Sequence, residues 1–449
     1  MREWVEEEKK KVFMPKHKTI AAIDIGTEKI CTLISVLHEG TREPQVVGVA
    51  SVPSRGLRKS QIVDLDEAIS AMTESVDAAE RMAGTGIKSA FVSVGGAHIQ
   101  SQNSKGVVAA SNPQGEITEE DVRRVIEAAR AVSLPNAREV IHVIPRDYQV
   151  DSQSGIKDPI GMSGVRLEAE AHIITGSSTA MRNITKCLSE LGIQCSGFVF
   201  SGLASAHAVL SETERELGVV VVDIGAGSTS ICAFVEGSLA YSGVLPIGAR
   251  HISADIALGL RMSLQSAEKI KLSLARVYTQ STEPLPGETR EQARERKKKH
   301  DELDPHAIGV TEEVGMLSKK TLVEGIIVPR LQEMFKLIGE ELEKQNLYPL
   351  IPAGIVLTGG GAETVQIVEV CKRMLNLPTR IGEPGGLTGL TDEIHSPMYS
   401  ATSGLLVYGV KTGAEESTPK GQDLTVFFKH LRVKQLIEKS VKFVRSLFP

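Results

Sequence analysis

Two distant segments of the chain carry nearly the same residues. Residues 23–27 read Ile-Asp-Ile-Gly-Thr after an apolar run, and residues 222–229 read Val-Asp-Ile-Gly-Ala-Gly-Ser-Thr after another. An aspartate at the end of a buried strand, beside a glycine turn that bears a hydroxyl group, can hold a hydrated Mg²⁺ while the N–H groups of the turn face phosphate. Two such turns predict a nucleotide clamped between two related lobes.

A third segment makes this interpretation more specific, because one Asp-x-Gly-Thr alone is equally typical of a simple tight turn. Residues 355–362 form an apolar run that leads into three consecutive glycines. Without Cβ atoms, such a backbone can approach a flat ligand such as a nucleobase or ribose. The sequence contains no G-x-x-x-x-G-K-[ST] motif that would offer a competing phosphate loop.

The three segments resemble the phosphate-1, phosphate-2 and adenosine motifs of the actin, Hsp70 and sugar-kinase superfamily. Within it, the chain most resembles the FtsA family of actin-like bacterial cell-division proteins, through residues 54–64, 94–99, 378–382 and 401–406. The resemblance implies an α/β, actin-like two-lobed fold with duplicated ribonuclease-H-like domains. It also implies a small α/β subdomain inserted in the first lobe and a C-terminal amphipathic helix on a flexible linker.

The apolar patterns and the resemblance together predict the order of the domains. They are an N-terminal extension (1–18), a first lobe (19–90 and 176–213), an inserted SHS2-like subdomain (91–175), a second-lobe core (214–256 and 326–410), a smaller second-lobe subdomain (257–325), a linker (411–423) and a terminal helix (424–449). Helices are expected at about 66–83, 118–132 and 179–191, and strands of the insert at 91–99, 106–110 and 166–175. Residues 198–210, rich in small side chains, should cross between the lobes.

The resemblance also implies a nucleotide site that takes ATP or ADP with Mg²⁺. Asp24 and Asp223 would organise the metal through water, and Lys29 would neutralise phosphate charge. Glu268 and Lys271 would reach the sugar or base from one helix face, although such a pair is also typical of a surface salt bridge. The implied nucleotide-binding residues are Asp24, Gly26, Thr27, Lys29, Asp223, Gly225, Ala226, Gly227, Ser228, Thr229, Glu268, Lys271, Gly359, Gly360, Gly361 and Ala362.

No residue is singled out as catalytic. Phosphoryl transfer to a small substrate needs a positioned carboxylate base and a pocket for the acceptor hydroxyl, and no sequence context marks either. We therefore expect at most slow ATP hydrolysis.

Composition limits the possible partners. With 449 residues and 41% hydrophobic content, the chain can bury the cores of several domains. A net charge of −5 gives no general attraction to nucleic acid, so none is expected as a partner.

The five cysteines include no C-x-x-C pair, which favours small buried side chains in a reducing compartment. The first 18 residues lack the apolar core of a secretory signal, and no apolar run approaches the ~18 residues of a membrane span.

Residues 280–306 are crowded with charge and contain proline and glycine. We expect a solvated loop there, with a docking surface for an acidic partner as the alternative.

The end of the chain has the pattern of an amphipathic helix. Placed on a helix, its apolar residues fall on one side: Val433, Leu436, Ile437, Val441, Phe443, Val444, Leu447 and Phe448. The other side carries the cations Lys434, Lys439, Lys442 and Arg445. This pattern suits an anionic membrane surface. A helix packed on the domain, or on a protein partner, is the alternative.

The resemblance implies an ATP-binding adaptor on the cytoplasmic side of the bacterial membrane at the division site. Such a protein polymerises with itself, binds the C-terminal tail of the tubulin-like protein FtsZ and helps recruit other division proteins. Polymerisation would multiply one modest membrane anchor by avidity. The alternatives are a PilM-like pilus-assembly adaptor and a small-molecule kinase of the same superfamily. An Hsp70-type chaperone is disfavoured because only a short linker and one helix follow the body.

Overall fold

The first lobe is built on one mixed sheet. The computed structural model describes residues 17–41, 43–112, 114–278 and 290–415. The strand order of this sheet is β3-β2-β1-β6-β11, with the short β19 beside β3. The first three strands are antiparallel, whereas β6 and β11 run parallel to β1. The bounds are β1 His17–Ile25, β2 Lys29–His38, β3 Gln45–Pro53, β6 Ser89–Val94, β11 Gln194–Phe200 and β19 Thr388–Gly389.

The second lobe repeats this arrangement. Its strand order β14-β13-β12-β17-β18 again has three antiparallel strands followed by two parallel ones. The central β12 is buried on both faces, which explains its run of valines. The bounds are β12 Val219–Ile224, β13 Thr229–Val235, β14 Ser238–Leu245, β17 Gly354–Thr358 and β18 Thr379–Ile381. The predicted duplication of a ribonuclease-H-like unit is confirmed.

Helix α1 (Leu65–Ala83) covers β2 and β3 of the first sheet. It begins where the Asp64 side chain accepts the N–H of Glu67, and it ends at the left-handed Gly84. Its buried face carries Ala68, Ala71, Met72, Ser75, Val76 and Ala79. The helix predicted at 66–83 is confirmed.

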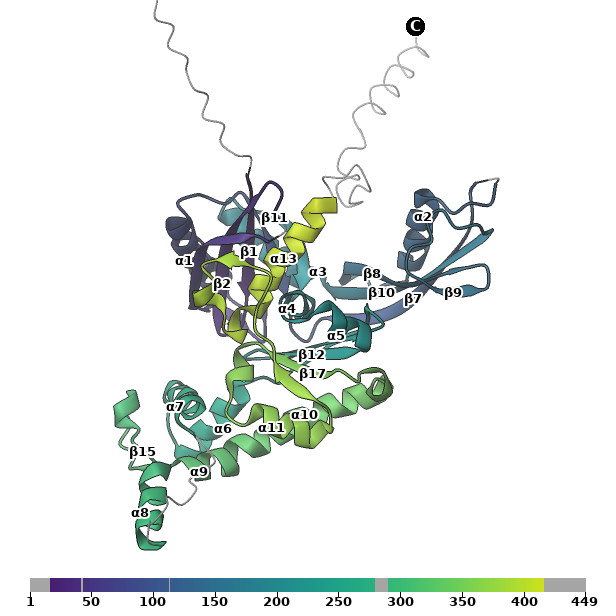
Figure 1. Cartoon of the computed structure of the whole chain (residues 1–449). Coiled ribbons are helices and arrows are strands. Elements are labelled where there is room, and N and C mark those ends of the chain that lie inside the picture. Colours follow the sequence, from purple (N-terminus) through teal and green to yellow (C-terminus); the bar gives the residue numbers. More distant parts are fainter. Residues whose placement is uncertain (1–16, 42, 113, 279–289, 416–449) are drawn as a thin grey trace, which may run out of the picture.

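Two helices pack against each other where the lobes join, in the centre of Figure 1. They are α4 (Ser201–Val209) and α13 (Ser400–Glu415). A Cβ atom at Gly404 would lie 1.7 Å from the carbonyl oxygen of Ala204, so the two backbones touch. The small residues of 198–210 serve this close crossing, as predicted.

Helix α13 also corrects the expected start of the linker at residue 411. The helix runs on to Glu415, and the Thr412 hydroxyl donates to the carbonyl of Tyr408 within it. The predicted terminal helix at 424–449, with its membrane-contacting residues, lies outside the described residues, as does the extension before residue 17. In the described ranges, no helix combines the length and the apolar character needed to cross a bilayer.

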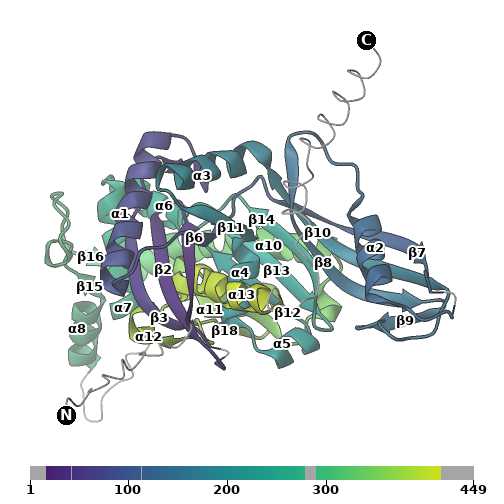
Figure 2. The same ribbon diagram turned by 90° about the horizontal axis from the view of Figure 1, so that it is seen from above.

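The inserted subdomain is a separate antiparallel sheet of order β7-β10-β8-β9, covered by helix α2. Figures 1 and 2 show it projecting sideways from the first lobe. Its own core includes Ile117, Val125 and Leu167. The bounds are β7 Gln100–Ala109, α2 Glu119–Arg130, β8 Arg138–Val150, β9 Gln153–Ile156 and β10 Arg166–Ser177.

One strand expected in the insert belongs elsewhere. The segment predicted as the insert's first strand, 91–99, overlaps the end of β6, which pairs with β1 and β11 of the first lobe. The strand predicted at 106–110 is longer and starts at Gln100. Alternation of apolar residues indicates a strand, but it does not indicate which sheet the strand joins.

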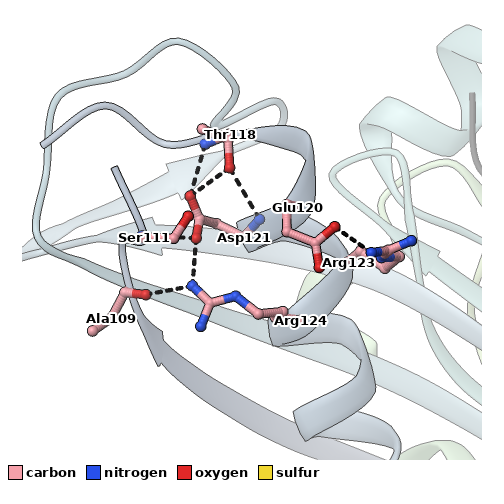
Figure 3. A network of polar contacts seen from close by, with 7 residues as sticks. All are labelled: Ala109, Ser111, Thr118, Glu120, Asp121, Arg123 and Arg124. Atoms are coloured by element: carbon pink, nitrogen blue, oxygen red, sulfur yellow. Dashed lines mark hydrogen bonds and ion pairs between the residues drawn. The ribbon is translucent and has the colours of Figure 1, made fainter. Parts of the chain in front are cut away.

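The start of α2 is held by the polar network of Figure 3. Asp121 is fully buried, and its carboxylate accepts the N–H and hydroxyl of Thr118, the N–H of Ser111 and the guanidinium of Arg124. Burial alone would raise the pKa of Asp121, but the hydrogen bonds from Thr118, Arg124 and Ser111 outweigh it and hold the pKa well below its usual range. Arg124 also donates to the carbonyl of Ala109, so the network joins α2 to β7.

The insert touches the second lobe along its edge strand β14. The Ser101 hydroxyl donates to the carbonyl of Ser242 at 2.5 Å, and the Asn103 amide donates to the carbonyl of Ala240 at 3.4 Å. The buried ring of His172 links the insert to β14. Its Nδ1 lies 2.6 Å from Asn103 Oδ1, and its Nε2 lies 2.8 Å from Ser242 Oγ. Burial lowers the pKa of His172 to about 3, so the ring is neutral and offers one donor and one acceptor.

The remaining elements build the smaller part of the second lobe and the connections. Residues Val323–Ile327 form one π-helical turn that leads from α9 into α10. The bounds are β4 Leu57–Arg58, β5 Gln61–Ile62, α3 Ser178–Glu190, α5 Glu212–Leu217, α6 Arg250–Leu260, α7 Leu264–Val277, α8 Arg290–Asp301, β15 Glu302–Leu303, β16 Leu317–Ser318, α9 Lys319–Leu322, α10 Val328–Lys344, α11 Ile367–Leu375 and α12 Thr391–Ile394.

The loop expected at 280–306 is corrected in its described part, residues 290–306. Residues 290–301 form helix α8, which Figure 1 shows projecting from the lower end of the second lobe, and β15 follows it. The high density of charge led to the prediction of a loop. Glutamate, arginine, lysine and alanine nevertheless all have good helix propensity.

Candidate functional site

The two repeated turns occupy equivalent positions in the two lobes. Asp24 and Asp223 are each the next-to-last residue of the central strand, β1 or β12. After β1, the N–H of Gly26 donates to the carbonyl of Lys29 at 2.9 Å. After β12, the N–H of Gly225 donates to the carbonyl of Ser228, also at 2.9 Å. The sequence repeat is therefore a repeat of the same hydrogen-bonded turn.

A serine from a neighbouring element orients each aspartate. Ser93 on β6 donates from Oγ to Asp24 Oδ1 at 2.5 Å, and Ser205 on α4 donates to Asp223 Oδ2 at 2.7 Å. Sequence reasoning missed both serines, because each is a lone hydroxyl in an apolar or small-residue segment. Each of these hydrogen bonds uses one oxygen of its carboxylate.

The electrostatics of the pair suit a cation. Burial raises the pKa of Asp24, against the hydrogen bond from Ser93 and the charge of Lys29. Burial also raises the pKa of Asp223 to about 6; Ser205 and Lys29 oppose the shift, and the charge of Asp24 adds to it. A cation between the two carboxylates would stabilise the ionised form of both aspartates and so offset the effect of burial. In the described ranges, no group of three or more His, Cys, Asp or Glu side chains is placed to hold a metal ion. Mg²⁺ usually keeps several water ligands and binds through one or two carboxylates, which Asp24 and Asp223 would supply.

Lys29 is engaged within the protein. Its ammonium group donates to the carbonyl of Met398 and lies 4.4 Å from the centre of the Tyr399 ring. This contact ties the first turn to the segment that packs against the glycine loop, where the N–H of Gly359 donates to the carbonyl of Pro397.

The three glycines of the third motif do not have the same role. A Cβ atom at Gly359 would lie 2.2 Å from Asp223 Oδ1, and one at Gly361 would lie 2.3 Å from Ile224 Cγ2. These two glycines let the loop pack onto the second turn. Gly360 is exposed, and a Cβ atom added there would lie 3.8 Å from its nearest neighbour, Met398 Cβ. Of the three glycines, it alone leaves room for a ligand. Ala362 is buried in the second lobe's core.

The two threonines of the repeated turns also differ. Thr27 Oγ1 accepts the N–H of Ser60 at 2.9 Å from the hairpin of β4 and β5. Thr229 is fully buried, and its hydroxyl donates to the carbonyl of Ile247 at 2.8 Å. Thr229 thus fixes the connection to α6, whereas Thr27 and Ser228 are partly exposed.

Glu268 and Lys271 meet on α7 as an ion pair. Lys271 Nζ donates to Glu268 Oε2 at 2.8 Å, and the Ser253 hydroxyl donates to the same oxygen. Lys271 is buried, so the pair is more enclosed than an ordinary surface salt bridge. The ion-pair alternative therefore describes their geometry in this structure, and a role at the nucleotide stays a prediction.

A cavity of about 550 Å³ lies between the lobes, lined by Thr27 from the first turn and Gly227 from the second. The hairpin of β4 and β5 supplies Arg58 and Lys59 to its wall, and the start of α6 supplies Arg250 and His251. Sequence reasoning missed these four basic residues, because they come from separate segments without a common motif.

Two lobes of equal strand order, joined by crossing helices and with paired aspartate turns at their interface, define the actin-like class of fold. Solved structures agree. The PilM–PilN type IV pilus biogenesis complex matches with a TM-score of 0.59 at 15% identity, covering 87% of this chain and 98% of that one. MreB5 of Spiroplasma citri bound to ADP matches with a TM-score of 0.51 at 13% identity, covering 90% and 99%.

Sequence comparisons identify the family. The family description "SHS2 domain inserted in FTSA" matches residues 96–175, and "Cell division protein FtsA" matches residues 220–404. The cell division protein FtsA of Pseudomonas aeruginosa is 39% identical over 395 residues, 88% of this chain and 90% of that protein. The FtsA of Bacillus subtilis is 34% identical over 402 residues, 89% and 85% of the two chains. The chain therefore belongs to the FtsA family of cell division proteins, and the pilus-assembly and kinase alternatives are not favoured.

Proposed function

We propose that the protein binds ATP or ADP with Mg²⁺ between its lobes and uses this binding to control self-assembly in cell division. The observation that carries the proposal is the equivalent placement of Asp24 and Asp223, each partly buried near the end of a central strand and oriented by a serine. The MreB5 structures of the same fold hold ADP or AMPPNP. The metal would neutralise the phosphates and the two carboxylates together. Hydrolysis, where it occurs, would be slow.

The test is nucleotide affinity in an Asp223→Asn variant. Asparagine keeps the size of the side chain and a partner for Ser205, but it removes the charge that would hold the hydrated metal. We expect Mg-ATP binding, measured by calorimetry, to weaken at least about tenfold. Asp392→Asn, an exposed change on α12, is the matched control and should bind as the unaltered chain does. Equal Mg-ATP affinity in both variants would contradict the proposed site.

We further propose that the protein polymerises on the cytoplasmic face of the membrane and tethers the FtsZ ring there. By resemblance to the family, residues 424–449 would form the membrane helix, and the smaller part of the second lobe, residues 257–325, would bind the FtsZ tail. In Figure 1 the end of α13, which leads to the tail, lies far from α8 of that smaller part. An anchor and a partner site at opposite ends would suit a tether.

Flotation with anionic liposomes in Mg-ATP tests this second step. The full chain should float, and it should do so more than linearly with protein concentration, because assembly multiplies weak anchors. A chain that ends at Gly421 should not float. Flotation of the shortened chain would refute the membrane role of the tail, and a strictly linear response would refute coupling to assembly.

A further inference from the structure

The cavity between the lobes has walls that the three nucleotide motifs do not supply. One wall is the tip of the β4–β5 hairpin, with Arg58 and Lys59, and the facing wall is the start of α6, with Arg250 and His251. Among the described residues that line the cavity, Glu67 is the single acidic one. The lining is therefore cationic where the two phosphate turns meet, and it suits an anionic group.

The hairpin tip is fixed directly over both turns. Lys59 and Ser60 have φ angles of 50° and 60°, a left-handed conformation that is unfavourable for residues other than glycine. The N–H of Ser60 donates to Thr27 Oγ1 at 2.9 Å, and a Cβ atom at Gly227 would lie 3.3 Å from the Cα atom of Lys59. Such a conformation persists where its surroundings hold it, and here the surroundings are the two phosphate turns.

The hairpin tip also touches the start of the inserted subdomain. A Cβ atom at Gly96, whose φ angle is +99°, would lie 2.9 Å from the carbonyl oxygen of Lys59. The tip therefore has neighbours on three sides, which keeps its two cations at the cavity.

The facing wall contributes a cation from the other lobe. The N–H of Arg250 donates to the carbonyl of Ala226 at 3.0 Å, so the residue is fixed to the second turn. Its guanidinium lies 3.5 Å from the carboxylate of Glu28 in the first turn. Both side chains are about half exposed, at 48% and 61%, so the pair is weakly held and can be exchanged for a stronger anion.

We propose that Arg58, Lys59 and Arg250 form a cationic cover for the terminal phosphate of a nucleoside triphosphate. The cover makes the site prefer the triphosphate to the diphosphate, because the diphosphate ends before it reaches these side chains. Glu28 holds Arg250 when no terminal phosphate is present and releases it when one arrives. This inference rests on the proposed nucleotide function and adds to it the residues that would discriminate the two nucleotide states.

The experiment measures affinities for Mg-ATP and Mg-ADP by calorimetry on full-length protein. Lys59→Asn removes the charge while asparagine tolerates the left-handed conformation. We expect its ATP affinity to fall about tenfold and its ADP affinity to change less than about threefold. Arg250→Gln, on the facing wall, should give the same ATP-selective loss. Lys88→Asn, a change of an exposed lysine just before β6, is the control and should leave both affinities unchanged.

A variant that is expected to raise the ATP affinity completes the test. Glu28→Gln removes the carboxylate that competes for Arg250, so its ATP affinity should rise while its ADP affinity stays constant. Equal losses for ATP and ADP in the cation variants, or no loss, would overturn the inference and leave the proposed function standing. Failure of the unaltered protein to bind either nucleotide would overturn both.

Discussion

Replacement of Asp121 by asparagine should loosen the inserted subdomain without touching the nucleotide site. The carboxylate is fully buried and accepts hydrogen bonds on both oxygens, from Thr118 on one and from Ser111 and Arg124 on the other. Asparagine offers one acceptor and one NH₂ group. Whichever way the amide turns, its NH₂ faces two donors, so about half of the network is lost.

The magnitude follows from these contacts. A hydrogen bond to a charged group contributes about 1.5–3 kcal/mol, and a buried donor left without a partner costs about 1–3 kcal/mol. Arg124 is 40% exposed and is therefore discounted. We expect the free energy of opening at the start of α2 to fall by about 2–4 kcal/mol, which corresponds to roughly 30- to 900-fold faster exchange of its amide hydrogens.

Hydrogen exchange followed by mass spectrometry is the assay, with Glu120→Gln as the matched control. Glu120 lies beside Asp121 on α2 but pairs with Arg123 at the surface, so its loss should shift exchange less than about threefold. The depressed pKa of Asp121 adds a pH signature. Its stabilisation is present above the usual carboxyl pKa and is lost as pH falls through the folded value. Exchange in α2 that is equal in both variants would refute the role of the network.

Two further predictions concern the lobes. Because burial raises the pKa of Asp223 to about 6, the stability that this carboxyl contributes to the ligand-free protein should be lost as pH rises from the usual carboxyl range through 6. In thermal unfolding, Asp223→Asn should therefore gain stability relative to the unaltered chain over this pH range, and a constant difference between the two would contradict the assignment. Gly404→Ala should push α4 and α13 apart and lower the unfolding temperature by several degrees, since its Cβ would lie 1.7 Å from Ala204 O. Gly325→Ala, with nothing within 4 Å of the new Cβ, should have little effect, and equal effects of the two alanines would count against the crossing.

The duplicated core could be predicted from sequence because its signals are local. An apolar strand, an aspartate and a glycine turn are adjacent in the chain at Asp24 and at Asp223, and the same turn forms in both places. The hydroxyls that orient the aspartates could not be predicted, since Ser93 and Ser205 reach them only through the packing of β6 and α4.

Other differences between the sequence-based predictions and the structure arise where one residue type can serve two roles. Thr229 fits a phosphate motif by spacing, yet its hydroxyl is turned to the carbonyl of Ile247. Gly359 and Gly361 fit a loop that approaches a ligand, yet their missing Cβ atoms make room for Asp223 and Ile224. The charged residues of α8 fit a solvated loop, yet they are also good helix formers. Sequence shows what a residue permits, and the tertiary contacts decide which possibility is used.

The contacts between the inserted subdomain and β14 also protect the outer strand of the second lobe's sheet. An outer strand of a sheet presents unpaired carbonyl and N–H groups that can recruit a foreign strand. Here Ser101 and Asn103 occupy the carbonyls of Ser242 and Ala240, and His172 buttresses them. The inserted subdomain therefore covers the edge strand of a sheet to which it does not belong. A chain without it would expose that strand in the other lobe, where it could pair with a strand of another molecule.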